Sequence, residues 1–275
     1  MTRIALLQTT TGIDPAGNAA TLVAGVEAAA RDGAEMLFTP EMSGLLDRDR
    51  ERAAPHILAE EANPVLAAVR EAAKANGIWV ALGSLAVARS DGRWANRSFV
   101  IDAGGKVVAR YDKIHMFDVE LATGEAWRES AAYAPGEAVV TAETPVGKLG
   151  LAVCYDVRFP ALFEALGRQR CDVIASPAAF TVPTGKAHWH LLQRARAVEA
   201  SAWVVAAAQV GEHADGRRTF GHSLVIDPWG EVVLDMGGEE AGIGFAENDG
   251  QRTTEIRRQL PSLAIRRPIL TSNQQ

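Results

Sequence analysis

Cys154 is one of two cysteines in the chain, and it lies where a thiol could act as a nucleophile. The apolar run Gly150-Leu151-Ala152-Val153 precedes it and a polar segment follows, so the side chain falls where a buried strand gives way to a helix. Such a junction exposes a nucleophile and directs backbone N–H groups towards it. Cysteines after strands are usually small buried hydrophobic residues, but the neighbouring Asp156 and Arg158 favour a chemical role. Cys171 has no such neighbours and is interpreted as structural.

Glu41 and Lys113 are residues of the types that a cysteine nucleophile needs. Glu41 follows the predicted strand at 35–39, and the carboxyl ends of strands are where α/β folds place their sites. Lys113 leaves a predicted hairpin strand and is followed by apolar residues, which favours a partly buried ammonium. A thiol attacks an amide as a thiolate, so a glutamate can accept its proton and a lysine can stabilise the oxyanion. In isolation each is more often a solvated surface charge.

The elements that must position these residues alternate between short apolar strands and alanine-rich helices, which predicts an α/β fold. Strands are predicted at 4–8, 35–39 and 78–85, and helices at 18–32 and 63–76. The pattern Asp-x-x-Gly-x-Val-Val occurs at Asp102 and again at Asp227, each time inside a predicted hairpin. This repeat indicates an internal duplication and two stacked sheets with helices on both outer sides, unless it is a chance match of common α/β patterns. We expect one domain over 1–275, with an extended C-terminal tail from about residue 253.

Composition excludes several classes of function. The net charge is −6, which disfavours a dedicated nucleic-acid binder. No run of about 18 apolar residues predicts a membrane span, and the apolar start is too short for a signal peptide. Two cysteines support no disulfide framework, so a cytoplasmic protein is expected. No cofactor or metal is predicted, because no phosphate-binding glycine loop is present and His188 and His190 would lie about 200° apart on a helix.

Several segments resemble the carbon–nitrogen hydrolase (nitrilase) superfamily, in particular its Nit branch of small amidases. They are Pro40-Glu41, the run from Asp112 to Val119, Cys154-Tyr155-Asp156-Val157-Arg158-Phe159-Pro160, the runs from Thr184 to Trp189 and from Leu192 to Glu199, and Phe220-Gly221-His222-Ser223. They keep their order along nearly the whole chain. The resemblance implies a four-layer αββα sandwich that usually dimerises, with Cys154 as nucleophile, Glu41 as general base and Lys113 as oxyanion lysine. It also implies that Glu129 is the second glutamate, which orients the lysine or the leaving amine.

The resemblance further implies hydrolysis of a small-molecule amide that carries a carboxylate, through a thioacyl-enzyme. Arg158 and Thr184 match substrate-contact positions, and the backbone N–H of Tyr155 is expected to bind the oxyanion. Arg158 could instead lock Asp156 by a salt bridge. Within the branch, the chain looks closer to amidases of deaminated glutathione than to ω-amidases of α-ketoglutaramate or α-ketosuccinamate. N-carbamoyl hydrolysis and an idle binding protein on the same scaffold stay open. Loops 42–56 and 116–132 are expected to shape the pocket, and we expect a homodimer with no nucleic-acid or membrane partner.

Overall fold

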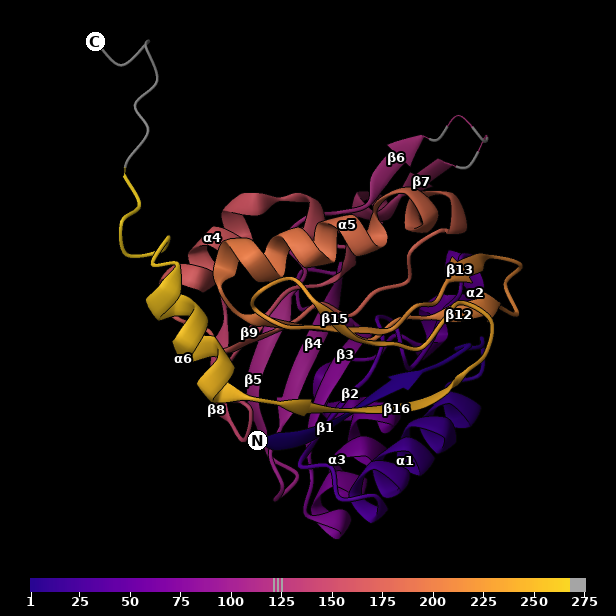
Figure 1. Ribbon diagram of the computed structural model, residues 1–275. Coiled ribbons are helices and arrows are strands. Elements are labelled where there is room, and N and C mark those ends of the chain that lie inside the picture. The colour runs from indigo at the N-terminus through magenta and orange to yellow at the C-terminus, as the bar shows by residue number, and fades with distance from the viewer. Residues whose placement is uncertain (121, 123, 125, 268–275) are drawn as a thin grey trace.

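The computed structural model describes the chain apart from residues 121, 123, 125 and 268–275, and its main body has four layers (Figure 1). Two six-stranded sheets stack in the middle. Helices α1 (Pro15–Arg31) and α3 (Pro64–Asn76) cover one outer side, and α4 (Pro160–Arg168) and α5 (Val182–Ala200) cover the other. The predicted αββα sandwich is therefore confirmed.

The first sheet has the strand order β16-β1-β2-β3-β4-β5. Its strands are β1 (Thr2–Gln8), β2 (Met36–Phe38), β3 (Trp79–Ala88), β4 (Trp94–Ile101), β5 (Val107–Asp112) and β16 (Gly242–Asn248). β1, β2 and β3 are parallel, and β4 and β5 continue the sheet as an antiparallel hairpin. The crossover helices begin at side-chain caps, since Asp14 and Asn63 each accept backbone N–H groups of the first turn.

The second sheet repeats this plan in the order β15-β14-β11-β10-β9-β8. Its strands are β8 (Thr141–Thr144), β9 (Gly147–Leu151), β10 (Val173–Ala175), β11 (Trp203–Ala206), β14 (Leu224–Ile226) and β15 (Val232–Asp235). β9, β10 and β11 are parallel, and β14 and β15 form the hairpin. Each half thus runs strand, helix, strand, helix, strand, hairpin, as the repeat at Asp102 and Asp227 predicts.

The core lies in layers because the parallel strands β1, β2 and β3 of the first sheet bury both of their faces. On β1, Ile4 and Leu6 point into the cluster between the two sheets, whereas Ala5 and Leu7 point into the cluster beneath α1 and α3. Strands buried on both faces have continuous apolar sequences instead of alternating ones. The two buried layers hold the carboxyl ends of the parallel strands in fixed positions, and the site residues follow those ends.

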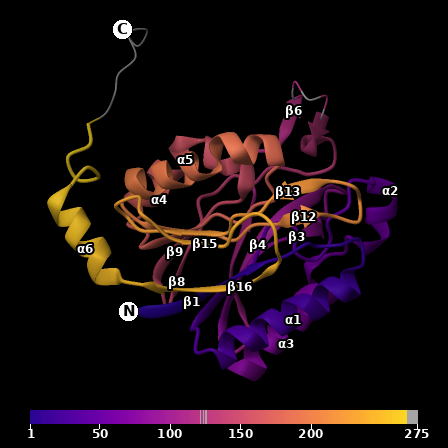
Figure 2. The same ribbon diagram turned by 45° about the vertical axis from the view of Figure 1, so that its right-hand side comes forward.

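The remaining elements are short, and those that Figures 1 and 2 label lie at one edge of the sandwich. They are β6 (Asp118–Glu120), β7 (Ala126–Arg128), β12 (Val210–Glu212), β13 (Arg218–Phe220), α2 (Arg50–Ala53) and the 3₁₀ turns η1 (Ala54–His56), η2 (Glu60–Ala62), η3 (Glu129–Ala131) and η4 (Cys154–Arg158). The β6–β7 hairpin projects beyond the body in both views. No helix among the described residues is long and apolar enough to cross a membrane.

The prediction of an extended tail from about residue 253 is wrong for its first part, because α6 spans Gly250–Gln259. The Asp249 side chain caps this helix, and Thr253 and Ile256 are buried. Arg257 fixes the helix to the body, since its guanidinium donates to the Ser201 carbonyl at 3.0 Å. A single buried apolar side chain leaves no helical periodicity in the sequence, so the helix could not be recognised there.

Candidate active site

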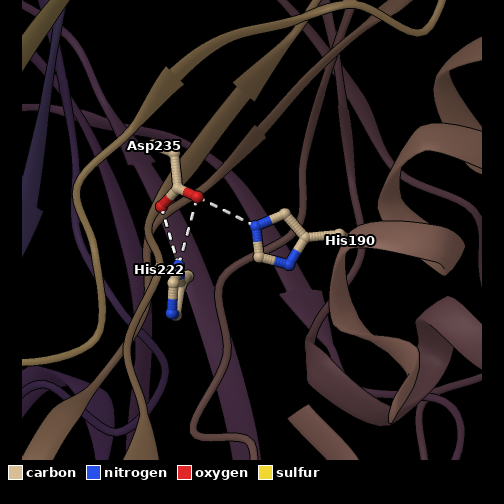
Figure 3. Close-up of side chains that lie close together, drawn as sticks. All are labelled: His190, His222 and Asp235. Atoms are coloured by element: carbon tan, nitrogen blue, oxygen red, sulfur yellow. Dashed lines mark hydrogen bonds and ion pairs between the residues drawn. The ribbon is translucent and has the colours of Figure 1, made fainter. Parts of the chain in front are cut away.

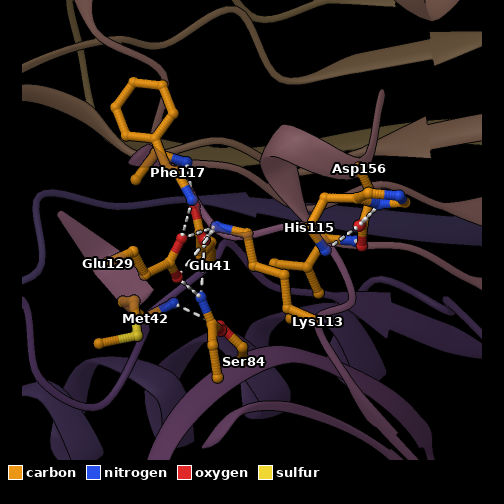
Figure 4. Close-up of polar contacts among 12 residues, drawn as sticks. Glu41, Met42, Ser84, Lys113, His115, Phe117, Glu129 and Asp156 are labelled. Carbon is orange, nitrogen blue, oxygen red and sulfur yellow. Dashed lines mark hydrogen bonds and ion pairs between the residues drawn. The ribbon is translucent and has the colours of Figure 1, made fainter. Parts of the chain in front are cut away.

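Glu41, Lys113, Glu129 and Cys154 come from four separate segments and line the same cavity. Figure 4 shows the three charged members of this cluster, Glu41, Lys113 and Glu129. Glu41, Lys113 and Cys154 follow β2, β5 and β9, and Glu129 begins the turn after β7. Lys113 Nζ lies 3.1 Å from Glu41 Oε1 and 2.8 Å from Glu129 Oε2. The lysine side chain is only 2% exposed, so it is more deeply buried than the sequence predicts.

Asn96 on β4 is a member of this cluster that sequence reasoning missed. Its Nδ2 donates to Glu41 Oε1 at 2.9 Å and to Glu129 Oε1 at 3.1 Å. This uncharged amide therefore holds both carboxylates in place. The sequence offers no clear signal for this role, because Asn96 stands beside two other polar residues of β4, Arg97 and Ser98.

Cys154 occupies a strained turn that presents its thiol. Its φ is +50°, in the left-handed region that non-glycine residues rarely adopt. The Cys154 N–H donates to the Pro177 carbonyl at 2.8 Å, which ties the turn to the end of β10. Asp156 fixes the other side, because its fully buried carboxylate accepts the Tyr111 hydroxyl at 2.7 Å and the Val153 N–H at 2.9 Å.

The electrostatics keep the resting thiol neutral. Burial raises the pKa of Cys154 well above its usual value, and the Glu41 carboxylate adds to this, while Lys113 acts in the opposite direction. Burial alone would lower the pKa of Lys113, but the Glu129 and Glu41 carboxylates outweigh it and raise that pKa well above its usual value. The lysine is therefore charged, and a thiol in this state can act as a nucleophile only if it loses its proton as it attacks. Glu41 is placed to accept it, and the Ala179 N–H, 2.9 Å from Oε2, orients its carboxylate.

The cluster opens into a cavity of about 380 Å³ that also contains the predicted substrate-contact residues Tyr155, Arg158 and Thr184. Its walls include Met42 and Leu46 from one loop and Phe117 and Trp127 from another. Both loops lie within the segments 42–56 and 116–132 that the sequence predicts to shape the pocket.

Arg158 does not pair with Asp156, so that alternative is wrong. Asp156 is occupied by other donors, including His115, whose Nδ1 lies 2.7 Å from Oδ1. The Arg158 guanidinium lies over the ring of Tyr155 at 5.7 Å and over that of Phe180 at 5.6 Å. Among the described residues it has no carboxylate partner within ion-pair distance. Its charge is therefore available to a ligand in the cavity.

The cavity is cationic although the protein as a whole is acidic. Among the described residues, seven cationic side chains line it, namely Arg48, Arg50, Lys113, Arg128, Arg158, Arg217 and Arg218. Three acidic side chains line it, namely Glu41, Asp47 and Glu129. Such an excess raises the local concentration of anionic ligands.

A possible metal site lies elsewhere, where His190, His222 and Asp235 approach one another (Figure 3). His188, the sequence neighbour considered for metal binding, is not part of this group. Asp235 Oδ2 lies 2.9 Å from His190 Nε2, and Oδ1 lies 2.9 Å from His222 Nδ1. These hydrogen bonds account for the arrangement, and we assign no metal to it.

Comparison with known proteins identifies the family. The family model for carbon–nitrogen hydrolases matches residues 3–258. The chain belongs to the carbon–nitrogen hydrolase family. A deaminated glutathione amidase from Yersinia enterocolitica is 41% identical over 233 residues, which cover 84% of this chain and 81% of the relative. This carbon–nitrogen hydrolase is thus an amide hydrolase, as the sequence predicts.

Solved structures agree with this assignment. The C. elegans NitFhit protein superimposes with a TM-score of 0.88 at 34% identity, covering 97% of this hydrolase and 65% of that chain. An amidase from Nesterenkonia sp. AN1 gives a TM-score of 0.79 at 26% identity, covering 96% of this chain and all of that one (100%). In a mutant of that amidase, acrylamide has undergone Michael addition at the active-site cysteine. The predicted resemblance to the nitrilase superfamily is confirmed.

Proposed function

We propose that this hydrolase cleaves the amide of deaminated glutathione, with Cys154 as nucleophile and a thioacyl-enzyme as intermediate. The observation that carries the proposal is the convergence of Glu41, Lys113 and Glu129 on a neutral buried thiol within a cationic cavity. The matching relative from Yersinia bears the name of that activity. No step of the proposed chemistry requires a metal or a cofactor.

In the first half of the reaction, Glu41 accepts the thiol proton while the Cys154 sulfur attacks the amide carbonyl carbon. The carbonyl π electrons move to oxygen, and the oxyanion is stabilised by Lys113 Nζ and the Tyr155 N–H. Glu41 then gives its proton to the leaving nitrogen, the C–N bond breaks and the amine departs. Glu129 holds Lys113 at 2.8 Å and so keeps the ammonium in place throughout.

In the second half, Glu41 accepts a proton from water as the water oxygen attacks the thioester. The C–S bond breaks, the thiolate takes the proton back from Glu41, and the free acid leaves. The carboxylate on the acyl part of the substrate binds Arg158, with the Thr184 hydroxyl beside it, because both side chains line the cavity and Arg158 has no acidic partner among the described residues.

The competing substrates use the same residues and are separated by kinetics. Wild type and Cys154→Ala should be assayed with deaminated glutathione, α-ketoglutaramate and an N-carbamoyl amino acid. The proposal predicts that deaminated glutathione has a kcat/KM at least about tenfold above the others and that Cys154→Ala loses activity on all three. Preference for α-ketoglutaramate would make the protein an ω-amidase, and preference for the carbamoyl compound would make it a carbamoyl hydrolase.

We further propose one domain over 1–275 that forms a cytoplasmic homodimer. Hydrogen bonds between the two halves support a single domain, because Gln209 Nε2 donates to the Glu41 carbonyl at 2.9 Å. Two exposed apolar side chains on α5 support a dimer, since Leu191 is 67% exposed and Val198 48% exposed. Both cysteines are buried free thiols, which suits a reducing compartment.

A further inference from the structure

A row of aromatic rings runs along the cavity and carries arginines at both ends. Trp127 and Phe117 have ring centroids 6.2 Å apart, and Phe117 and Tyr155 have centroids 5.1 Å apart. Beside Tyr155 lies Arg158, whose guanidinium is 5.7 Å from the ring centroid. Beside Trp127 lie Arg48 and Arg217. The cavity therefore has two cationic ends joined by an apolar wall.

The Trp127 end has two guanidinium groups over one ring. Arg48 lies 5.6 Å and Arg217 4.9 Å from the Trp127 ring centroid. One buried carboxylate organises both arginines, because Asp215 Oδ2 accepts Arg217 Nε at 2.7 Å and the backbone N–H of Arg48 at 2.8 Å. Stacking and this shared anchor restrict the two side chains before any ligand arrives, so less entropy is lost on binding.

The charges at this end do not cancel. Asp215 forms an ion pair with Arg217, and the nearby Asp47 forms one with Arg52 at 2.7 Å. Among the residues that the structure describes, Arg48 has no carboxylate partner for its guanidinium. Arg218 also lines the cavity here and is exposed. Counted over the described residues, a net positive charge faces the cavity, where a carboxylate can accept hydrogen bonds from Arg48 and from the remaining N–H groups of Arg217.

The reacting groups lie along the row between these ends. The Phe117 N–H donates to Glu129 Oε2 at 2.6 Å, and Glu129 holds Lys113. Tyr155 directly follows Cys154. A substrate lying along the aromatic wall would therefore place its scissile amide beside the Cys154 thiol. One end of the substrate would then reach Arg158, and the other end would reach Arg48 and Arg217.

We infer that Arg48 and Arg217, held over Trp127, form a second carboxylate-binding site. This site binds the carboxylate that the leaving amine of the substrate carries. The inference rests on the proposed function and names the class of leaving group as a small amine that carries its own carboxylate, such as a short peptide. An ammonia leaving group, as released from an ω-amide, has nothing to place there. The second site thus favours a substrate with a carboxylate on both sides of the scissile bond.

The test compares deaminated glutathione with its analogue in which the C-terminal carboxylate is a carboxamide. Wild type should prefer the carboxylate by about tenfold or more in kcat/KM, mainly through KM, because a contact remote from the reacting atoms is present in ground and transition states alike. Arg48→Gln should reduce that preference about fivefold or more, and Trp127→Leu should act in the same direction by removing the ring that supports both arginines. Arg48 is exposed, so its replacement should leave the fold intact.

A matched control is Arg31→Gln on α1, whose side chain is 71% exposed and lies outside the cavity lining. It should keep the wild-type preference. If wild type hydrolyses the carboxylate and the carboxamide equally well, or if Arg48→Gln slows both to the same extent, the second site is overturned while the amidase assignment stands. If wild type hydrolyses neither, the proposed function itself has failed, and the inference fails with it.

Discussion

At the scale of single residues, the cluster around Lys113 is explained better by chemistry than by stability. Burying an ammonium and two carboxylates costs several kcal/mol per ion before their attraction is counted, and apolar residues of similar size often replace such groups without loss. Lys113 is nevertheless 2% exposed and lies within 3.1 Å of Glu41. The proposed role of Lys113 would account for the arrangement, because a fixed positive charge beside a nucleophile is what an oxyanion requires.

Replacing Lys113 with methionine removes the charge while nearly keeping the length of the side chain. We expect kcat to fall by about 100-fold or more with little change in KM, because the lost interaction is made with the oxyanion in the transition state. Steady-state kinetics on deaminated glutathione measure this. A rise in KM with kcat preserved would show instead that the lysine binds the substrate. Lys74→Met on the outer helix α3 is the control and should behave as wild type.

At the scale of elements, we expect the stability of the hairpin β12–β13 to depend on the protonation state of the buried residue His213. His213 follows β12, with Nδ1 2.9 Å from the Thr11 carbonyl and Nε2 2.7 Å from the Thr219 hydroxyl. Burial lowers the pKa of His213 below its usual value of 6.5. The unfolded chain therefore binds a proton at a higher pH than the folded chain does.

It follows that His213 contributes stability that is fully present above about pH 6.5 and is lost as the pH falls towards its lower folded-state pKa. We expect the free energy of unfolding in urea to decrease between about pH 7 and pH 5. In the His213→Gln variant, the free energy of unfolding should depend less on pH over this range, even if the variant is less stable than the wild type at pH 7. Asp47, whose usual pKa is 3.8 and is lowered further by its hydrogen bond to Arg52, titrates below this window. Equal slopes for wild type and variant would contradict the assignment.

The elements also show what the sequence could predict. The strands before Glu41 and Cys154 are predictable because they are buried on both faces and therefore continuously apolar. The structure of the cavity mouth cannot be predicted from the sequence. There, the hydrogen bond from the Arg48 N–H to Asp215 joins residues 167 positions apart and leaves no local pattern. Arg158 illustrates the same limit: its neighbour Asp156 suggests an ion pair, but a hydroxyl and backbone groups from elsewhere in the fold occupy that carboxylate.

At the scale of the whole molecule, the outer face of α5 is the strongest candidate for a contact between subunits. Leu191 and Val198 lie two turns apart on one side of the helix and are exposed. The turn at Trp229 packs beside them, since Arg194 Nε donates to the Gly230 carbonyl at 2.8 Å and Trp229 is 48% exposed. Exposed apolar surface of this kind typically marks an interface.

We expect sedimentation equilibrium to give about twice the chain mass of 29.3 kDa for the wild type. Leu191→Asp should raise the dimer dissociation constant about tenfold or more, because a carboxylate would lose its water in an apolar contact. Val108→Asp, on the edge strand β5 with 41% of the side chain exposed, should leave the dimer unchanged. A wild type that sediments as a monomer, or a Leu191→Asp variant that dimerises normally, would contradict the proposed surface.

In the proposed mechanism, Cys154 carries the acyl group between the two halves of the reaction. Rapid quenching of wild type with excess deaminated glutathione, followed by intact-protein and peptide mass spectrometry, measures this directly. We expect one acyl adduct, located on the peptide that contains Cys154 and absent from Cys154→Ala. An adduct on Cys171, or turnover by Cys154→Ala at a rate near that of the wild type, would contradict it.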